Sequence, residues 1–249
     1  MASPNENTLP SSWTTTLRKR VTPYLTTLSH GSAPFITTFL LIHLSAPVMA
    51  NLGGTSLASQ VMLLGREYYQ TSFGEKYLLL VPLAVHSLSG IAKRVVAPSP
   101  LRRRFTSLLS LTAYAAYALF LPVHFMTHRI YPSDPNPPIY EVGPSELDYE
   151  LVKVSLHTWP WRSWFLYTGL TLCVAWHAAE GARVIWNTSW REYGGGWKVS
   201  TKRRVVGATL AMLPVLSGVF FISREPVYAF STLSSRFQHA LSQSFFYRL

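Results

Sequence analysis

The sequence predicts an all-α membrane protein with five transmembrane helices, four of which form a bundle of the type that holds haem. Of the 249 residues, 48% are apolar and 13% are charged, and the apolar residues gather in long runs. Five runs approach the ~20 residues that a helix needs to cross hydrocarbon. Barrel strands are about half that length and alternate in polarity, so a helical bundle is predicted and a soluble domain is disfavoured.

The predicted spans follow the chain in order, at residues 33–52, 77–97, 105–126, 164–186 and 205–223. Residues 1–32 precede them as an N-terminal tail. A Pro-rich, acidic loop fills 129–162, where prolines forbid a continuous helix but 151–157 fits a short interfacial one. The C-terminal tail, 225–249, has an apolar face at helical spacing that predicts an amphipathic surface helix, made by Phe230, Leu233, Phe237, Leu241 and Phe245.

The first four spans read as two parallel copies of a two-helix unit. Residues 33–104 form the first copy and 105–200 the second, while the span within 201–224 stands outside the repeat. In each copy the first helix ends in a histidine, His43 or His124, and the second carries His-x-x-x-Gly. Both copies begin on the same side, which predicts a pseudo-twofold axis along the membrane normal.

Charge placement predicts the topology. The formal net charge is +11, but the bases cluster beside predicted span ends, at 18–20, 93–104 and 198–204, all on one side. The positive-inside rule then puts the N-terminus in the cytosol and the C-terminus across the membrane. These clusters favour anionic phospholipid headgroups as partners, and no nucleic-acid partner is predicted.

The two His-x-x-x-Gly motifs predict a haem b site. His86 stands four residues before Gly90, and His177 four residues before Gly181. Residues i and i+4 share a helix face, so each histidine lies beside a glycine that has no side chain to block a flat ligand. Neutral imidazoles from two helices are the usual ligands of a six-coordinate haem iron, which makes His86 and His177 the predicted metal ligands.

Depth supports this pair more than the other. His86 lies about eleven residues and His177 about nine residues from the cytosolic boundary, which places them at nearly one level at about 1.5 Å per residue. Lys93, Arg94 and Arg183 lie nearer that boundary, where they can meet the haem propionates. A second haem would need His43 and His124, whose counted depths differ by roughly 13 Å.

The alternatives to haem are structural. A buried histidine can hydrogen-bond between helices, and a small residue at i+4 can simply allow close packing. The spans contain no catalytic motif, and Glu180 is their one acidic residue. No chemical catalysis is therefore predicted. Cys173 is the single cysteine, which excludes an internal disulfide.

Two resemblances rest on these residues. The segment His86-Ser-Leu-Ser-Gly90-Ile-Ala-Lys93 resembles the haem-ligand helix of the cytochrome b anchor of succinate dehydrogenase. Over nearly its whole length the chain is similar to the fungal Mdm-ten-complementing protein family. That similarity is carried by Leu41-Ile-His43-Leu44, by Leu83-Ala-Val-His86-Ser-Leu-Ser-Gly90 and by Ala175-Trp-His177-Ala-Ala-Glu-Gly181-Ala-Arg183.

The family resemblance implies a role in lipid homeostasis at the mitochondrial outer membrane, with the C-terminus in the intermembrane space. It implies an adaptor for a bridge-like lipid-transfer protein of the vacuolar protein sorting thirteen type, and lipid scrambling. Recruitment in the family uses a Pro-x-Pro motif in the N-terminal tail, where this chain has the isolated Pro4 and Pro10. The alternative function is a b-type cytochrome, a membrane electron-transfer subunit that uses His86 and His177.

Overall fold

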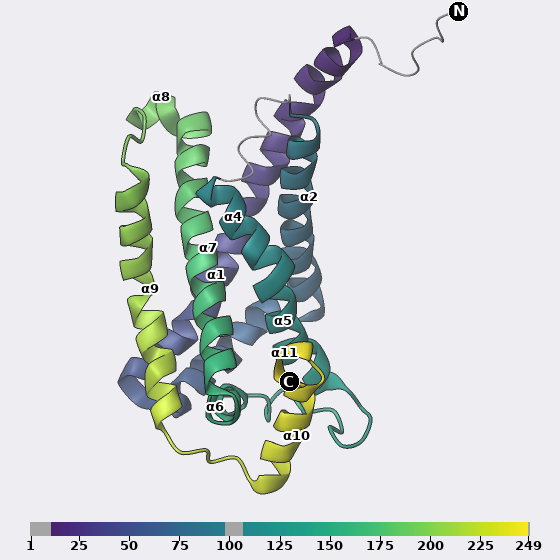
Figure 1. Ribbon diagram of the computed structural model, residues 1–249, viewed down its shortest axis with the longest axis vertical. Helices are drawn as coiled ribbons and strands as arrows, with labels where there is room; N and C mark the ends of the chain where they lie inside the picture. The colour runs from purple at the N-terminus through teal and green to yellow at the C-terminus, as the bar shows by residue number, and fades with distance from the viewer. Residues whose placement is uncertain (1–10, 98–106, 249) are drawn as a thin grey trace, which may run out of the picture. The chain divides into compact units, whose positions relative to one another are not determined.

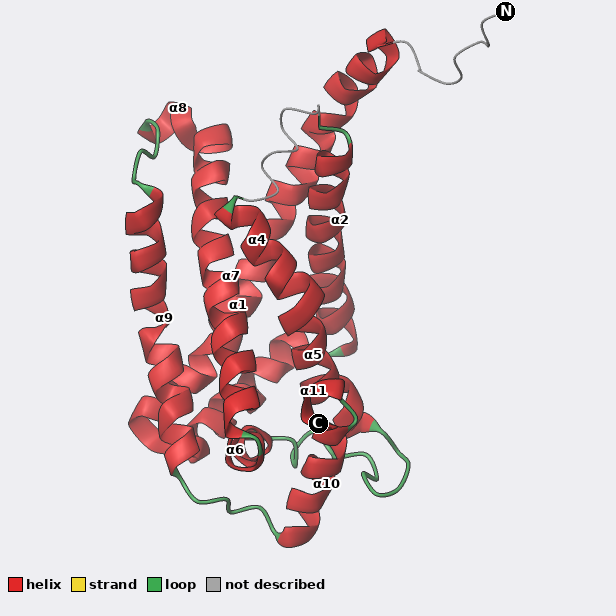
Figure 2. Cartoon of the chain, in the orientation of Figure 1, coloured by secondary structure: helices red, strands yellow, loops and turns green. Residues whose placement is uncertain are grey.

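The computed structural model describes residues 11–97 and 107–248. Pro4 and Pro10 of the tail and the predicted basic residues 102–104 lie outside this part of the chain. The described residues form helices and no strand, joined by loops of which the longest connects residues 133 and 149 (Figure 2). The predicted all-helical class is therefore confirmed.

The chain divides into two compact units, each described here by itself. The first lies within Met1–Leu40 and Tyr68–Arg104, and the second within Leu41–Glu67 and Phe105–Leu249. The first contains the start of α1 (Ser11–Tyr69), the π-helical η1 (Gly74–Leu80) and α2 (Val81–Val95). Helix α2 continues directly from η1, and Pro82 lies at the junction of the two.

The second unit contains the rest of α1 and all later elements. These are α4 (Leu108–Ala115), η3 (Ala116–Phe120), α5 (Leu121–Phe125), η4 (Met126–Ile130), η5 (Tyr131–Ser133), α6 (Tyr149–Thr158), α7 (Pro160–Ile185), η6 (Trp186–Trp190), α8 (Arg191–Gly194), α9 (Thr201–Arg224), α10 (Ser231–Ser242) and α11 (Phe245–Arg248). In Figure 1, α7 and α9 run antiparallel side by side, and α4 lies against α7.

Among the described residues, four helical segments are long and apolar enough to cross a membrane: Thr16–Tyr69, Gly74–Val95, Leu108–Ser133 and Thr201–Arg224. The chain is therefore a multi-pass membrane protein. Helix α7 has 26 residues but is not among them, because its tryptophans, Arg162, His177, Glu180 and Arg183 lower its hydropathy. The predicted fifth span and the two-helix repeat stay predictions.

Helix α1 differs from its predicted bounds at both ends. It starts at Ser11 rather than at residue 33, runs through Pro23, and extends to Tyr69. Its hydrogen bonds break at Gly53 and Gly54, and Gly54 has φ 59°, a conformation that favours glycine. Gly53 and Gly54 therefore form a kink in α1, and the helix continues from Thr55 to Tyr69.

The C-terminal tail packs inward. Phe237, Ala240 and Leu241 on α10 have no solvent exposure and pack with Ile139 and Leu151 in the core of the second unit. Helix α10 ends at Ser242, so Phe245 lies on α11 and is 69% exposed. The predicted amphipathic helix exists, but the long loop and α6 cover its apolar face, so it is not a free surface helix.

Candidate functional site: membrane-embedded polar residues and a buried ion network

His86 of the first unit is oriented by a backbone carbonyl. Its Nδ1 lies 2.9 Å from the carbonyl oxygen of Ser29 on α1 and 3.4 Å from the Ser32 hydroxyl. A carbonyl oxygen only accepts, so Nδ1 carries the hydrogen and Nε2 carries the lone pair. One turn on, no described heavy atom lies within 4 Å of a Cβ placed on Gly90.

His177 of the second unit has the same environment. Its Nδ1 lies 3.1 Å from the carbonyl oxygen of Leu109 on α4, and a Cβ on Gly181 meets no described heavy atom within 4 Å. A carbonyl that fixes the tautomer in this way is typical of metal-ligating histidines. The two histidines belong to different units, so their predicted pairing on one iron stays a prediction.

The bases near these histidines have protein partners. Arg183 lies 3.7 Å from a carboxylate oxygen of Glu180, as its spacing suggests. The stronger partner of Glu180 is Arg204 of α9, at 2.7 Å, and both side chains are buried. Sequence reasoning missed Arg204, because α9 packs on α7 through a contact that no local pattern shows. Lys93 and Arg94 of the first unit are half-buried.

A set of polar side chains lies inside the helices of the second unit, and we refer to it as the polar track: His43, His124, His128, Tyr167 and Ser155. The rings of His43 and His124 lie 5.9 Å apart, and those of His124 and His128 stack at 4.3 Å. His128 Nε2 lies 3.1 Å from the Tyr167 hydroxyl, which lies 2.8 Å from the Ser155 hydroxyl.

The polar track corrects two expectations. The predicted depth difference of roughly 13 Å between His43 and His124 does not hold, because their rings lie 5.9 Å apart. The predicted depth of His43 assumes that its helix begins at residue 33, whereas α1 begins 22 residues earlier, at Ser11. His128, which its place just beyond the third predicted span assigns to contact with headgroups or solvent, has a protein partner, the Tyr167 hydroxyl on α7. The i, i+4 spacing of His124 and His128 was the signal available in the sequence.

The space at the track is small as the structure has it, and a second haem held by His43 and His124 stays a prediction. The enclosed space beside His124, His128, Tyr167 and Tyr247 measures about 10 Å³, which holds about one water and no porphyrin. Among the described residues, no group of three or more His, Cys, Asp or Glu side chains is arranged to hold a metal ion.

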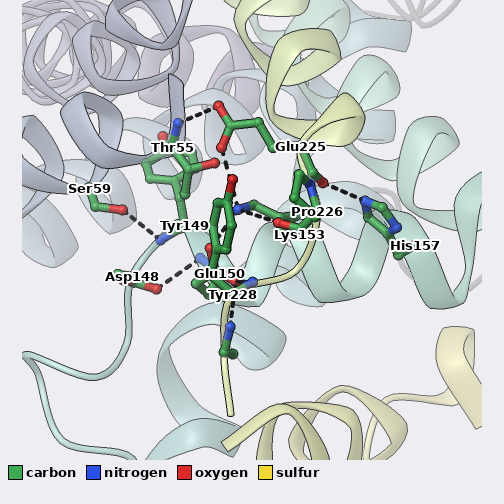
Figure 3. A network of polar contacts seen from close by, with 11 residues as sticks. Thr55, Ser59, Asp148, Tyr149, Glu150, Lys153, His157, Glu225, Pro226 and Tyr228 are labelled. Carbon is green, nitrogen blue, oxygen red and sulfur yellow. Dashed lines mark hydrogen bonds and ion pairs between the residues drawn. The ribbon is translucent and has the colours of Figure 1, made fainter. Parts of the chain in front are cut away.

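A buried ion network joins α6 to the segment after α9 (Figure 3). Lys153 is fully buried, and its Nζ lies 2.6 Å from Glu150 Oε1 and 3.4 Å from Glu225 Oε2. It also donates to the Pro226 carbonyl at 3.0 Å and lies 4.4 Å from the centre of the Tyr228 ring. The ammonium is thus paired on several sides, as a buried charge requires.

The carboxylates of this network hold the backbone. Glu150 Oε2 accepts the amides of Tyr228 and Ala229 at 2.9 and 3.0 Å, which fixes the start of the C-terminal tail. Glu225 Oε1 accepts a hydrogen bond from the Thr55 amide at 3.0 Å. Thr55 is the first residue after the α1 kink, where the backbone N–H groups of a new helical segment need partners. A carboxylate there also suits the positive end of the helix dipole.

The network explains two pKa shifts outside the spans. Burial raises the pKa of Glu225, but the hydrogen bonds from Thr55 and the charge of Lys153 outweigh it, and the net shift is downward. Burial raises the pKa of Asp148, and this exceeds the opposing hydrogen bond from the Glu150 amide. The sequence placed Asp148 in the Pro-rich loop and Glu225 at the start of the C-terminal tail, and it gave no sign that Glu225 meets Thr55, 170 residues away.

A polar clamp joins α1 to α9 inside the second unit. Asn51 Nδ2 donates to the Pro214 carbonyl at 2.8 Å, and the Ser217 hydroxyl donates to Asn51 Oδ1 at 2.7 Å. One turn further, a Cβ on Gly218 would collide with the Pro47 carbonyl oxygen, so only glycine allows this close approach. Beside the clamp lies an open groove of about 910 Å³.

Comparison with known proteins gives no further guide. No protein-family model, no curated protein and no solved structure matches the chain.

Proposed function

We propose that this chain is a multi-pass protein of the mitochondrial outer membrane that works in lipid homeostasis, as a lipid scramblase and as the adaptor for a bridge-like lipid-transfer protein. The polar track carries the scrambling part of this proposal. Its three histidines lie in candidate spans, and polar groups at membrane depth are costly enough to mark substrate pathways.

The exposure of the track supports a path for headgroups. His43, His124, His128 and Tyr167 are half-buried, so each residue keeps some accessible surface. Imidazole and phenol groups both donate and accept hydrogen bonds, and they replace part of the water that a headgroup loses in the bilayer. No bond is made or broken in this process, and the chain is not proposed to be a chemical catalyst.

The adaptor role and the location are supported by the family resemblance. In this proposal the N-terminus faces the cytosol and the C-terminus the intermembrane space, in agreement with the basic clusters at 18–20 and 198–204. A fluorescent bridge-like lipid-transfer protein should gather on mitochondria when the chain is overexpressed. An unchanged distribution of that protein contradicts the adaptor role.

Scrambling is tested with the purified full chain in liposomes that carry a fluorescent phospholipid. A membrane-impermeant quencher should remove nearly all the signal, and Tyr167→Phe or His128→Leu should slow this exchange roughly two- to tenfold, as expected for a lost hydrogen bond. Tyr117→Phe is the matched control, because Tyr117 lies in a span but outside the track. Quenching that stops at the outer-leaflet signal rules out scrambling.

A second candidate, a b-type cytochrome, is favoured by one specific observation. His86 and His177 both give their Nδ1 hydrogen to a carbonyl, which leaves Nε2 as the metal-binding atom, and both stand beside an open glycine. In this candidate His86 and His177 would hold haem, which would supply one-electron chemistry when bound. Arg183, with 37% of its side chain exposed, is the base placed to meet a propionate.

An absorption spectrum of the purified protein decides this candidate. A Soret band that is lost in His86→Ala and in His177→Ala supports bis-histidine ligation. His239→Ala is the control, because His239 lies on α10 and is exposed. A missing band, or a band that survives both substitutions, rejects it. A haem-bearing protein that also scrambles lipid satisfies both candidates.

A further inference from the structure

The groove beside the Asn51 clamp is an open recess of the second unit. It lies between α1 and α9 and is lined by Val48, Asn51, Leu52, Leu210, Leu213, Pro214, Leu216 and Ser217. Its volume of about 910 Å³ falls within the ~300–1,000 Å³ typical of small-molecule sites. Leu52, Leu210 and Leu213 are 78%, 58% and 50% exposed, so the lining is not covered by the unit itself.

The position of the groove identifies the medium that faces it. All eight lining residues lie in two segments that are long and apolar enough to span a membrane, Thr16–Tyr69 and Thr201–Arg224. The surroundings of such a surface are hydrocarbon rather than water. Its occupant is therefore drawn from the bilayer.

The chemistry of the lining selects the part of the lipid. The eight residues include no charged side chain, so the groove offers no partner for a phosphate or an ammonium. The two polar side chains are already bonded, Ser217 to Asn51 and Asn51 to the Pro214 and Val48 carbonyls. What remains is an apolar wall that matches an acyl chain.

The groove is also held open by structure. The close contact of Gly218 with Pro47 and the amide bridge of Asn51 fix the separation of α1 and α9. Pro214 lies inside α9 at this point, and its ring removes one hydrogen bond of the helix. Preorganised walls reduce the ordering cost of a bound chain.

We propose that this groove binds one acyl chain of a membrane phospholipid, as a specific site distinct from the polar track that receives the headgroup. The inference rests on the lipid role proposed above and adds to it a place for the hydrocarbon part of the substrate. The polar track and the groove thus divide one amphipathic molecule between two surfaces of the second unit.

The test uses the full chain in phosphatidylcholine nanodiscs that contain a trace of phosphatidylcholine with a diazirine on one acyl chain. After irradiation, labelled peptides are mapped by mass spectrometry. Label should concentrate in residues 48–52 and 210–217, and Leu213→Trp should reduce it there roughly tenfold by filling the groove. Val206→Trp is the matched control, because it adds the same ring at a 49% exposed position of α9 outside the lining.

Each outcome is decisive. Label spread evenly over the exposed faces of α9, or unaffected by Leu213→Trp, overturns the acyl-chain site. Loss of the label from the groove when a small fraction of sterol is added to the nanodiscs also overturns it, in favour of a sterol site. Scrambling that persists while the groove is unlabelled refutes this inference alone, whereas groove labelling without scrambling refutes the scramblase proposal and leaves the acyl-chain site standing.

Discussion

The ammonium nitrogen of Lys153 lies 2.6 Å from a carboxylate oxygen of Glu150, in a place where the Lys153 side chain has no solvent exposure. The second carboxylate, from Glu225, lies 3.4 Å away and reaches from there to the α1 kink. The ammonium of Lys153 thus links α6 to the start of the C-terminal tail and, through Glu225, to the part of α1 that follows the kink. This arrangement leads to the first two predictions.

Replacing Lys153 by methionine should destabilise the second unit strongly. The substitution keeps the volume but leaves two carboxylates without their buried cation, and breaking a buried pair costs about 3–5 kcal/mol. Thermal unfolding in detergent, followed by tryptophan fluorescence, measures the loss. Lys198→Met is the control, because Lys198 is exposed. Equal melting temperatures for the two variants would show that the network contributes nothing.

The two shifted acids should respond to pH with opposite signs. The pKa of Glu225 is lowered from 4.5, so its carboxylate stabilises the folded state above pH 4.5 and loses this effect as pH falls through the lower, folded-state pKa. Glu225→Gln should therefore be less stable than the parent at pH 7, and the difference should disappear in acid. Unfolding curves across this range supply the measurement.

Asp148 gives the opposite case. Its pKa is raised from 3.8 by burial, so its charged form costs stability at neutral pH, and this cost is relieved as pH falls through the raised value. Asp148→Asn keeps the acceptor for the Glu150 amide and should stabilise the unit at pH 7 but not below pH 3.8. The same sign for both variants would contradict the assigned shifts.

These acids also show what a sequence reveals and what it conceals. Apolar runs predicted helices that the structure has, because the length needed to cross hydrocarbon is a local property. The ends of α1 were missed, because polar residues continue a helix beyond the bilayer without changing the apolar run. The buried Lys153 was missed for a different reason: its partner Glu225 is far away in the sequence, and no pattern marks that pair.

The candidate sites divide in the same way. The i, i+4 spacing of His177 and Gly181 showed that they share a face, but not that Leu109 fixes the tautomer. Likewise, the i, i+4 spacing of His124 and His128 predicts that they share a helix face. The contact of His128 with Tyr167 depends on how α7 packs, which the spacing does not show. Local periodicity predicts faces, whereas packing between helices decides partners.

Two glycines of α1 should respond to alanine in opposite directions. At Gly54 the backbone has φ 59° and a Cβ would strike the Glu225 carboxylate, so Gly54→Ala should cost about 1–3 kcal/mol and release the Thr55 amide. At Gly31 the backbone is helical and no described heavy atom lies within 4 Å, so Gly31→Ala should gain about 0.5–1 kcal/mol. Thermal unfolding of both variants measures this. Similar shifts for both would mean that the kink is not strained by a side chain.

The open glycines allow haem binding to be separated from helix packing. The space beside Gly90 and Gly181 accepts a side chain, so Gly181→Leu should keep the helical content and melting temperature of the apoprotein, with a small gain from the better helix former. A flat ligand on that face would be blocked, and the cytochrome candidate therefore predicts loss of the Soret band in Gly181→Leu and in Gly90→Leu. Gly207→Leu is the control, because a Cβ there also meets no described heavy atom within 4 Å, on a helix without a proposed haem ligand. A Soret band that persists in both variants would place any haem elsewhere, while a fall in melting temperature in the haem-free protein would show that the glycines serve packing.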